Sequence, residues 1–480
     1  MEIPHIDVII VGAGLSGIGA AYHLQKRCPN LNYVILEARS EMGGTWNLFR
    51  YPGIRSDSDM FTLGYSFRPW EDRKAIADGP SILRYIKDTA KAFKIDEKIL
   101  YQHKIKSAAW SSHDRKWTVD IEREGGSEKL SCRFLIMCSG YYDYESGFLP
   151  DYPGLSTFQG QFVHPQHWDP NLNYAGKKIV VIGSGATAVT LVPELAKHAR
   201  HVTMLQRSPS YYAALPSTDH VAEFLKENLN KTLAYHLIRW KNIFLSLGFF
   251  AFCRFFPFAA RRLLLMGVKK ELKGSDASIA NFKPKYDPWD QRLCIVPDGD
   301  LFQALRAGKA EVLTDAITSF IPTGLQLESG KQLNADLIIS ATGLKVKFLA
   351  GIPIFVDEQR IDPRSLLPYK GAMFSGIPNL AMTFGYTNAS WTLKCDLIGE
   401  WVAKVLAFMQ LRGYSAVRPD ENPGVRRTEL FDLSSGYIQR AKESLPQQGS
   451  RAPWKMSQNY FADLYSYKFQ PIDDEGLTFS

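Results

Sequence analysis

The stretch DVIIVGAGLSGIGAAYHLQKR, residues 7–27, joins a short β-branched run to three glycines in G-x-G-x-x-G spacing. The run from Asp7 to Val11 predicts a buried parallel strand, and the small and apolar residues after the glycines predict a helix. Gly12, Gly14 and Gly17 would turn the chain so that backbone N–H groups and the positive helix end face a pyrophosphate. We therefore expect a dinucleotide-binding unit to begin here.

The second strand of this unit is predicted in NYVILE, residues 32–37. Glu37 ends it 20 residues after Gly17, which is where a carboxylate accepts hydrogen bonds from ribose hydroxyls. A glycine-rich turn without a ligand and a solvated charge at a strand end are the simpler alternatives. The spacing favours the ribose contact.

A second glycine-rich turn follows the predicted strand Ile179–Ile182. Gly183, Gly185 and Ala188 have the spacing G-x-G-x-x-A, an accepted variant of the same motif. The two turns begin 171 residues apart, at Gly12 and Gly183. That separation is too large for one dinucleotide fold, so the sequence predicts two Rossmann-like units.

The strand VTMLQ, residues 202–206, ends where an NAD site would offer Asp or Glu. Here Gln206 is followed by Arg207 and Ser208. An acidic side chain would repel a 2′-phosphate, whereas Arg207 can pair with it. We expect NADPH in the second unit, with Arg207 and Ser208 at its 2′-phosphate. The alternative is that Arg207 is a surface charge.

Two further motifs lie outside these turns. FQGQFVHPQHWD, residues 158–169, fills the pattern F-x-G-x-x-x-H-x-x-x-W-D, and GGTW, residues 43–46, is followed by YPG and Asp57. By composition alone the first could be a buried aromatic turn with core histidines. The second could be a glycine-rich loop with a solvated acidic turn, in which Asp57 and Asp59 form a charge cluster with Arg55.

These motifs, in this order along nearly the whole chain, resemble those of the type I Baeyer–Villiger monooxygenases. The segment DQRLC, residues 290–294, is most similar to the subgroup that includes the ethionamide-activating monooxygenases. The related flavin-containing monooxygenases usually carry a ring and then a lysine in place of Trp168 and Asp169. The resemblance implies FAD in the first unit, with Gly44, Thr45 and Trp46 on its flavin side.

The resemblance also assigns roles to side chains. Arg292 matches the arginine that the family keeps over the flavin, and Asp57 matches the carboxylate beside that arginine. His164 would couple domain movement to cofactor binding, with Trp168 next to it in the linker. Gln291 replaces a lysine that often helps hold the 2′-phosphate, which leaves more of that task to Arg207.

The implied reaction starts with reduction of FAD by NADPH and addition of O2 to give a C4a-peroxyflavin. This species would convert small lipophilic ketones to esters or lactones and could oxidise sulfides, with Arg292 stabilising the developing negative charge. One alternative is a flavin-containing N/S-oxygenase without ketone activity. A disulfide oxidoreductase is disfavoured because the chain has no C-x-x-C pair, and a non-enzymatic scaffold would not bind flavin.

The predicted fold is α/β, with FAD-binding and NADPH-binding Rossmann-like domains and a helical insertion in the NADPH domain. We assign residues 1–145 and 336–480 to the FAD-binding domain, the latter ending in a surface tail from about Gly449. Residues 146–217 and 275–335 form the NADPH-binding domain, and 218–274 form the insertion. The insertion is expected to pack on the NADPH domain. Its alternative role is an apolar wall of the substrate channel that also touches a membrane surface.

The composition of the chain restricts its possible binding partners and its cellular compartment. The chain has 480 residues and a net charge of +8, without a dense Lys/Arg block, so we expect no nucleic-acid partner. No two of the six cysteines form a C-x-x-C pair, which disfavours a zinc site or any other metal site of that kind. Free thiols and the absence of an export signal predict a cytoplasmic protein.

Overall fold

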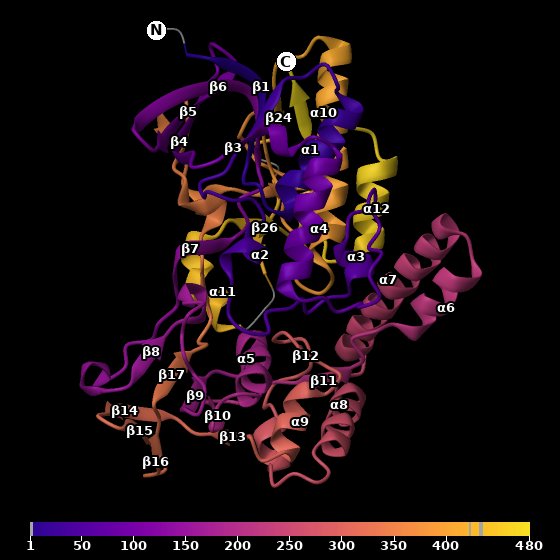
Figure 1. Ribbon diagram of the computed structural model, residues 1–480. Helices are drawn as coiled ribbons and strands as arrows, with labels where there is room; N and C mark the ends of the chain where they lie inside the picture. Colours follow the sequence, from indigo (N-terminus) through magenta and orange to yellow (C-terminus); the bar gives the residue numbers. More distant parts are fainter. Residues whose placement is uncertain (1–2, 422–423, 432–434) are drawn as a thin grey trace.

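The computed structural model describes residues 3–421, 424–431 and 435–480. Figure 1 shows two domains stacked on one another, with both chain termini at the far end of the first domain. Each domain is built on a sheet that contains parallel strands, which confirms the predicted α/β class.

The first domain contains a sheet in the order β20-β19-β4-β5-β6-β1-β2-β3, with β23 paired to β6 and β21 and β22 beyond it. Its strands are β1 His5–Val11, β2 Tyr33–Leu36, β3 Ile99–Leu100, β4 Lys104–Ser111, β5 Lys116–Arg123, β6 Gly126–Met137, β19 Ile354–Val356, β20 Gln359–Arg360, β21 Pro368–Tyr369, β22 Met373–Phe374 and β23 Leu380–Met382. Its helices are α1 Leu15–Arg27, α2 Thr45–Leu48, α3 Met60–Leu63, α4 Gly79–Ala92, α10 Trp391–Arg412, α11 Gly436–Ala441 and α12 Tyr460–Phe469.

Strand β1 is central because it is parallel to β2 on one side and to β6 on the other. Val8, Ile9 and Ile10 are fully buried, as expected for a strand covered on both faces. Helix α1 packs along α10, a helix from almost 400 residues later in the chain. The carboxyl end of β1 therefore delivers the first glycine-rich turn into the middle of the domain.

The second domain has a parallel sheet in the order β13-β10-β9-β17-β8. Its strands are β8 Gln161–Val163, β9 Lys178–Ile182, β10 His201–Gln206, β13 Ala310–Thr314 and β17 Leu337–Ser340, and its helices include α5 Ala186–Ala196 and α9 Asp300–Arg306. Strand β17 pairs with both β9 and β8. The predicted domain boundary at residue 335 is therefore wrong by one strand, because this buried strand completes the second sheet before the chain returns.

Smaller sheets and pairs surround the two main sheets. They are β7 Tyr142–Gly147 with β18 Leu344–Val346, β11 Tyr212–Leu215 with β12 Cys294–Pro297, the meander β14 Ile317–Ile321, β15 Gly324–Leu327 and β16 Gln332–Asn334, then β24 Val417–Pro419 with β27 Leu477–Phe479 and β25 Arg427–Glu429 with β26 Gln447–Gly449. The pair β7–β18 joins the two segments that cross between the domains.

The insertion is helical as predicted, with α6 His220–Asn228, α7 Lys231–Phe255 and α8 Pro257–Glu271. Its packing differs from the expectation. Buried residues of α7, such as Ile238 and Ile243, join the core of the first domain, whereas Val268 in α8 joins the core of the second. Arg239 contributes to the packing of α7 on the first domain, because its buried guanidinium donates hydrogen bonds to the carbonyls of Phe61 and Gly64 at 2.8 and 3.0 Å. The insertion thus bridges both domains.

Candidate active site

The two domains meet around a cavity of about 300 Å³. Its wall combines the first glycine-rich turn, the GGTW loop, the segment 54–58, the start of α5, Arg292 and the start of α10. No residue of the insertion 218–274 is part of this wall. The alternative role of the insertion, as a wall of the substrate channel, is therefore not seen in this cavity.

The first glycine-rich turn shows why glycine is needed. Gly12 has φ +100°, and a Cβ there would lie 2.7 Å from the carbonyl oxygen of Cys138. A Cβ on Gly17 would lie 1.9 Å from the carbonyl oxygen of Gly12. Gly14, by contrast, lines the cavity, and its nearest neighbour to such a Cβ is the Cα of Gly44 at 3.5 Å. Gly12 and Gly17 shape the turn, while Gly14 faces the ligand space.

Glu37 holds the first glycine-rich turn through its carboxylate. Its Oε2 accepts a hydrogen bond from the N–H of Ala13 at 2.8 Å, and its Oε1 accepts one from the N–H of Arg39 at 3.0 Å. Burial raises the pKa of Glu37, and these two hydrogen bonds oppose that shift. The carboxylate therefore sits at the end of β2 as predicted and is held against the turn.

The GGTW loop approaches the first turn backbone to backbone. Gly44 has φ +53°, and a Cβ on it would lie 3.1 Å from the Cα of Gly14. Thr45 and Trp46 follow at the start of α2, and both line the cavity. The structure thus brings Gly14, Gly44, Thr45 and Trp46 together, as the sequence predicted.

Arg292 and Asp57 form an ion pair inside the cavity. The Nη1 of Arg292 lies 3.4 Å from the Oδ2 of Asp57, and their side chains remain 40% and 36% exposed. Asp57 raises the pKa of Arg292, an effect that outweighs the opposing effect of burial, so the guanidinium stays charged. Both side chains line the cavity, so the guanidinium borders the space that a ligand would fill.

The predicted charge cluster around Arg55 does not form. Arg55 pairs with Asp300 of α9 in the second domain. Asp59 caps α3, where its Oδ1 accepts from the N–H of Thr62 at 3.0 Å. Each neighbour of Asp57 is thus engaged elsewhere, which leaves Asp57 to Arg292.

An aromatic wall faces this ion pair. Tyr141 stacks on Trp391 with ring centroids 5.2 Å apart, and Phe384 contacts both rings. Trp391 is fixed in turn by a hydrogen bond from its Nε1 to the Oγ of Ser16 at 3.0 Å. All four residues line the cavity. The start of α10 is therefore part of the site, as the sequence suggested.

The C-terminal part of the chain adds lining residues that the sequence did not predict. Phe431, Tyr437 and Ile438 border the cavity. Phe431 stacks on Phe384 with centroids 5.2 Å apart. No glycine motif or charge pattern marks these positions, because they reach the site only through the long return of the chain.

The second glycine-rich turn approaches the same cavity from the other domain. Gly183 has φ +138°, and a Cβ there would lie 2.4 Å from the carbonyl oxygen of Ala341. Gly185 is open, with no atom within 4 Å of such a Cβ, and Ala188 is buried in α5. Ala186 and Thr187, at the start of α5, line the cavity. The N-terminal end of α5 therefore faces the same space as α1.

Arg207 and Ser208 are exposed at the end of β10. Arg440 of α11 was not predicted as a site residue, yet its guanidinium stacks 3.4 Å over the ring of Phe148. Partial burial lowers the pKa of Arg440, and repulsion by Arg207 lowers it further. Two arginines from distant parts of the chain thus create positive potential beside the second turn.

The linker motif, residues 158–169, lies outside the cavity wall. Trp168 is buried in the core of the second domain and does not line the cavity. His164 also lies outside the cavity, pressed against Gly147, where a Cβ would lie 1.9 Å from its Cε1. Burial lowers the pKa of His164, so a neutral imidazole is favoured. Trp168 thus packs within the second domain and His164 packs against Gly147, and neither side chain lines the cavity.

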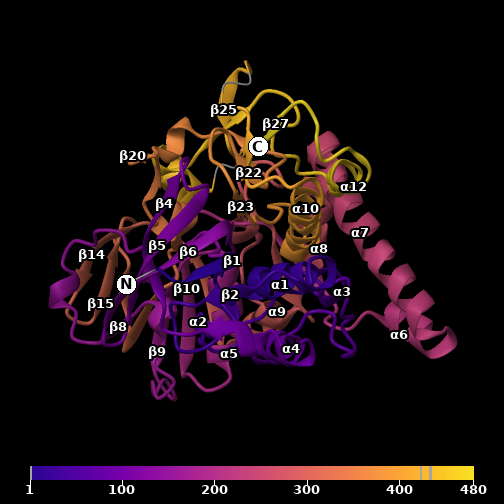
Figure 2. The same cartoon turned by 90° about the horizontal axis from the view of Figure 1, so that it is seen from above.

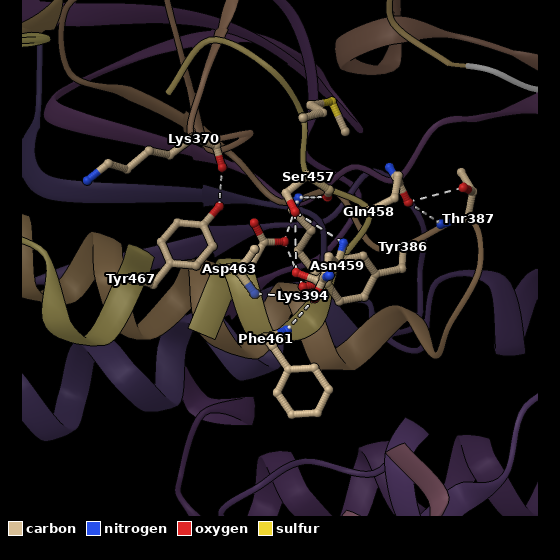
Figure 3. A network of polar contacts seen from close by, with 12 residues as sticks. Lys370, Tyr386, Thr387, Lys394, Ser457, Gln458, Asn459, Phe461, Asp463 and Tyr467 are labelled. Atoms are coloured by element: carbon tan, nitrogen blue, oxygen red, sulfur yellow. Dashed lines mark hydrogen bonds and ion pairs between the residues drawn. The ribbon is translucent and has the colours of Figure 1, made fainter. Parts of the chain in front are cut away.

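Figure 3 shows a buried polar network behind the cavity wall. Tyr386, a lining residue, donates a hydrogen bond to the Oδ2 of Asp463 at 2.6 Å. Fully buried Lys394 lies 3.0 Å from the same carboxylate and donates to the carbonyl of Ser457 at 3.0 Å. Because Asp463 belongs to α12, the predicted surface tail is instead an integral part of the first domain.

Removing the hydroxyl of Tyr386 is expected to lower the free energy of unfolding and to leave turnover almost unchanged. Tyr386→Phe leaves Asp463 paired with Lys394 but one acceptor position empty, at a cost of about 1–2 kcal/mol. Thermal and urea unfolding should show this loss. Turnover should stay close to that of the parent, because the hydroxyl is committed to Asp463. A large fall in turnover with unchanged stability would show that this hydroxyl takes part in the reaction.

Possible metal ligands and the cysteine thiols near the cavity bear on the chemistry of the site. The described residues contain no group of His, Cys, Asp and Glu that could hold a metal ion. All six cysteines are unpaired and buried. Cys138 lines the cavity, but burial raises its pKa to about 12, so the thiol stays protonated. The cytoplasmic location expected from free thiols remains a prediction.

Two glycine-rich turns that open on one cavity define an oxidoreductase with two dinucleotide-binding domains. Residues 6–214 match the family described as flavin-binding monooxygenase-like. The FAD-containing monooxygenase EthA of Mycolicibacterium smegmatis is 50% identical over 480 residues, covering 99% of this chain and 97% of that protein. The chain therefore belongs to the flavin-binding monooxygenase-like family, as one of its FAD-containing monooxygenases.

Two solved structures share the fold of the whole chain. The oxidised steroid monooxygenase bound to NADP is 21% identical with a TM-score of 0.76, covering 99% of each chain. OTEMO in complex with FAD and NADP is 20% identical with a TM-score of 0.75, covering 100% of each chain. These likenesses confirm the fold.

Proposed function

We propose that the protein is an NADPH- and O2-dependent monooxygenase that converts lipophilic ketones to esters or lactones and also oxidises sulfides. The observation that carries this proposal is the charged Arg292, held by Asp57 at 3.4 Å inside a cavity whose wall includes the rings of Tyr141, Phe384 and Trp391. An oxygenase that acts on carbonyl groups needs such a cation, because negative charge develops on the carbonyl oxygen when it is attacked. Oxidation of a sulfide requires no such oxyanion.

The residues present fit both dinucleotides. Backbone N–H groups at the starts of α1 and α5 face the cavity, and Gly14 leaves room there that a side chain would fill. Gly12, Gly14, Gly17 and Glu37 would hold FAD, while the turn at 183–188 and Arg207 would hold NADPH. Bound FAD, once reduced by NADPH, supplies the redox chemistry with O2.

The protein's own groups would position the substrate and control charge. Arg292 offers planar N–H donors to a carbonyl oxygen, and Asp57 holds that guanidinium in one orientation. Tyr141, Phe384 and Trp391 form an apolar surface that excludes water and suits a lipophilic ketone. The mechanism thus rests on orientation and electrostatic stabilisation by this chain.

The decisive experiment is product analysis. The purified holoenzyme is reduced with NADPH without oxygen, then exposed to air with linear ketones, cyclic ketones or thioethers. Esters or lactones identified by mass spectrometry support the proposal. Sulfoxides without any ester would instead indicate an S-oxygenase that lacks ketone activity.

Arg207 is expected to set the coenzyme preference. Arg207→Ala should remove most of the preference for NADPH over NADH, because a charge-assisted phosphate contact contributes about 1.5–3 kcal/mol, or tens-fold in affinity. Steady-state kinetics with both coenzymes measure this ratio.

Arg440, the other arginine beside the second turn, offers a matched comparison with Arg207. Arg440→Ala should lower the preference for NADPH less than Arg207→Ala, since Arg440 is partly engaged with Phe148. If the parent enzyme uses NADH as well as NADPH, Gln291 has weakened the phosphate site and the assignment of NADPH is wrong.

A further inference from the structure

We infer that the elbow between α7 and α8 binds an anionic lipid surface. The elbow surface consists of Phe255, Phe256, Phe258, Arg262, Leu263, Met266, Lys269 and Lys270. This inference goes beyond the proposed reaction, and it concerns where the enzyme works.

The aromatic tip of the elbow is unusually exposed. Phe255, Phe256 and Phe258 are 78%, 62% and 79% exposed. Clustered exposed apolar side chains of this size mark an interaction surface, whereas single exposed ones do not.

The exposure continues along α7 at helical spacing. Leu233, Leu237, Phe244 and Phe255 fall on one side of the helix, and all four are exposed. The opposite side is buried against the first domain through residues such as Ile238 and Ile243. Figures 1 and 2 show α7 along the edge of the molecule, with α6 at its outer end. One face of α7 is thus anchored in protein and the other is largely exposed, with Phe244 also touching the ring of Phe461.

The positive charge of this region favours an anionic partner. Between Lys231 and Lys270 there are eight Lys or Arg residues and no Asp or Glu. Within the described residues, Arg262, Lys269 and Lys270 have no carboxylate partner, and all three are exposed on α8. In a twofold pairing with a second copy, these cations would face cations. An anionic lipid surface neutralises them and accepts the phenylalanines.

The geometry indicates a helix pair that lies in the interface and does not span it. Among the described residues, no single helix is long and apolar enough to cross a membrane. Helices α7 and α8 meet that test only together, and they are bent by 116° at the elbow. A basic, aromatic elbow of this kind lies in the headgroup layer with its charges toward the lipid phosphates.

The elbow is connected to the segment that carries the catalytic arginine. Phe250 of α7 packs edge-on against Trp289 with centroids 5.4 Å apart, and Arg254 pairs with Asp290 at 3.0 Å. Arg261 of α8 donates to the carbonyl of Pro284 at 2.7 Å. A lipid surface at the elbow would therefore lie beside residues 284–292, where a lipophilic substrate dissolved in the bilayer is close to Arg292.

Vesicle binding by the FAD-loaded full chain tests the inference. We expect the protein to co-sediment with vesicles of phosphatidylcholine and phosphatidylglycerol, and to bind less as salt is raised. The triple variant Phe255→Ser, Phe256→Ser, Phe258→Ser should bind at least about tenfold more weakly. The triple variant Arg262→Glu, Lys269→Glu, Lys270→Glu should also lose at least about tenfold, because each basic side chain near the surface contributes about fivefold.

Matched controls separate lipid binding from misfolding and from self-association. Leu411→Ser and Lys98→Glu change an exposed leucine and an exposed lysine elsewhere and should bind vesicles like the parent. Melting temperature and flavin content show that each variant is folded, whatever its activity toward ketones. Equal binding to vesicles of phosphatidylcholine alone, or binding that survives both triple changes, overturns the inference. If the parent forms an oligomer in solution and does not bind vesicles, and the phenylalanine variant is monomeric, the surface instead binds a second copy of the chain.

Discussion

Arg292→Ala is expected to keep consuming NADPH while forming almost no ester. In the proposed reaction the guanidinium would stabilise negative charge on the substrate oxygen, a step that follows reduction of the flavin. Removing one such preorganised donor costs roughly 100- to 1,000-fold in turnover. The measurements are NADPH oxidation, hydrogen peroxide release and ester formation in the same sample. Ester formation at the parent rate would show that Arg292 is not the catalytic arginine.

Two neighbouring changes make this result specific. Asp57→Ala should uncouple less severely, because it removes the partner at 3.4 Å and leaves the charge itself in the cavity. Arg292→Lys keeps a charge but loses the planar fork of donors, so it should recover only part of the ester formation. Flavin content is checked in all three variants, since a loss of FAD would mimic a loss of catalysis.

Gly14→Ala is expected to abolish tight FAD binding. The backbone at Gly14, with φ −82° and ψ −172°, is open to any residue, and a Cβ there lies no closer than 3.5 Å to the protein. The variant should therefore fold. The added methyl group enters the cavity at the start of α1, where the pyrophosphate must approach closely, at a cost of about 1–3 kcal/mol, which is about 5- to 150-fold in affinity. The ratio of flavin to protein absorbance measures this.

Other glycines provide the controls for this prediction. Gly267→Ala, exposed on α8 with no atom within 4 Å of its Cβ, should retain flavin and stability. Gly17→Ala should fail to fold, because its Cβ would lie 1.9 Å from the carbonyl oxygen of Gly12. Full flavin occupancy in Gly14→Ala would contradict the assignment of this turn to the cofactor.

The sequence alone determined the parts of the protein that depend on local geometry. Buried strands and helices follow from the spacing of apolar residues, so β1, α1, β9 and α5 were predictable. The positive φ of Gly12 and Gly183 follows from turns that side chains rarely tolerate. Motif spacing placed Gly14 in the first turn, and the resemblance to the type I Baeyer–Villiger monooxygenases placed Gly44, Thr45 and Trp46 beside it.

Only the tertiary structure decided the features that depend on distant segments. The partner of Arg55 is Asp300, which lies 245 residues away, and nothing near Arg55 in sequence indicates that pairing. Tyr437, Ile438 and Arg440 reach the site from a segment without a motif, and Asp463 secures the cavity wall through Tyr386.

The same distinction explains two placements that the sequence did not predict. Trp168 lies in the core of the second domain, because a large apolar ring is stabilised most by burial. The C-terminal tail is rich in aromatic residues, which suggested surface folding. In the structure its residues Trp454, Tyr460 and Tyr467 are buried, because α10 offers an apolar face that no local segment covers. Spacing along the chain determines turns and strands, whereas burial of surfaces that meet only after folding decides which side chains complete the site.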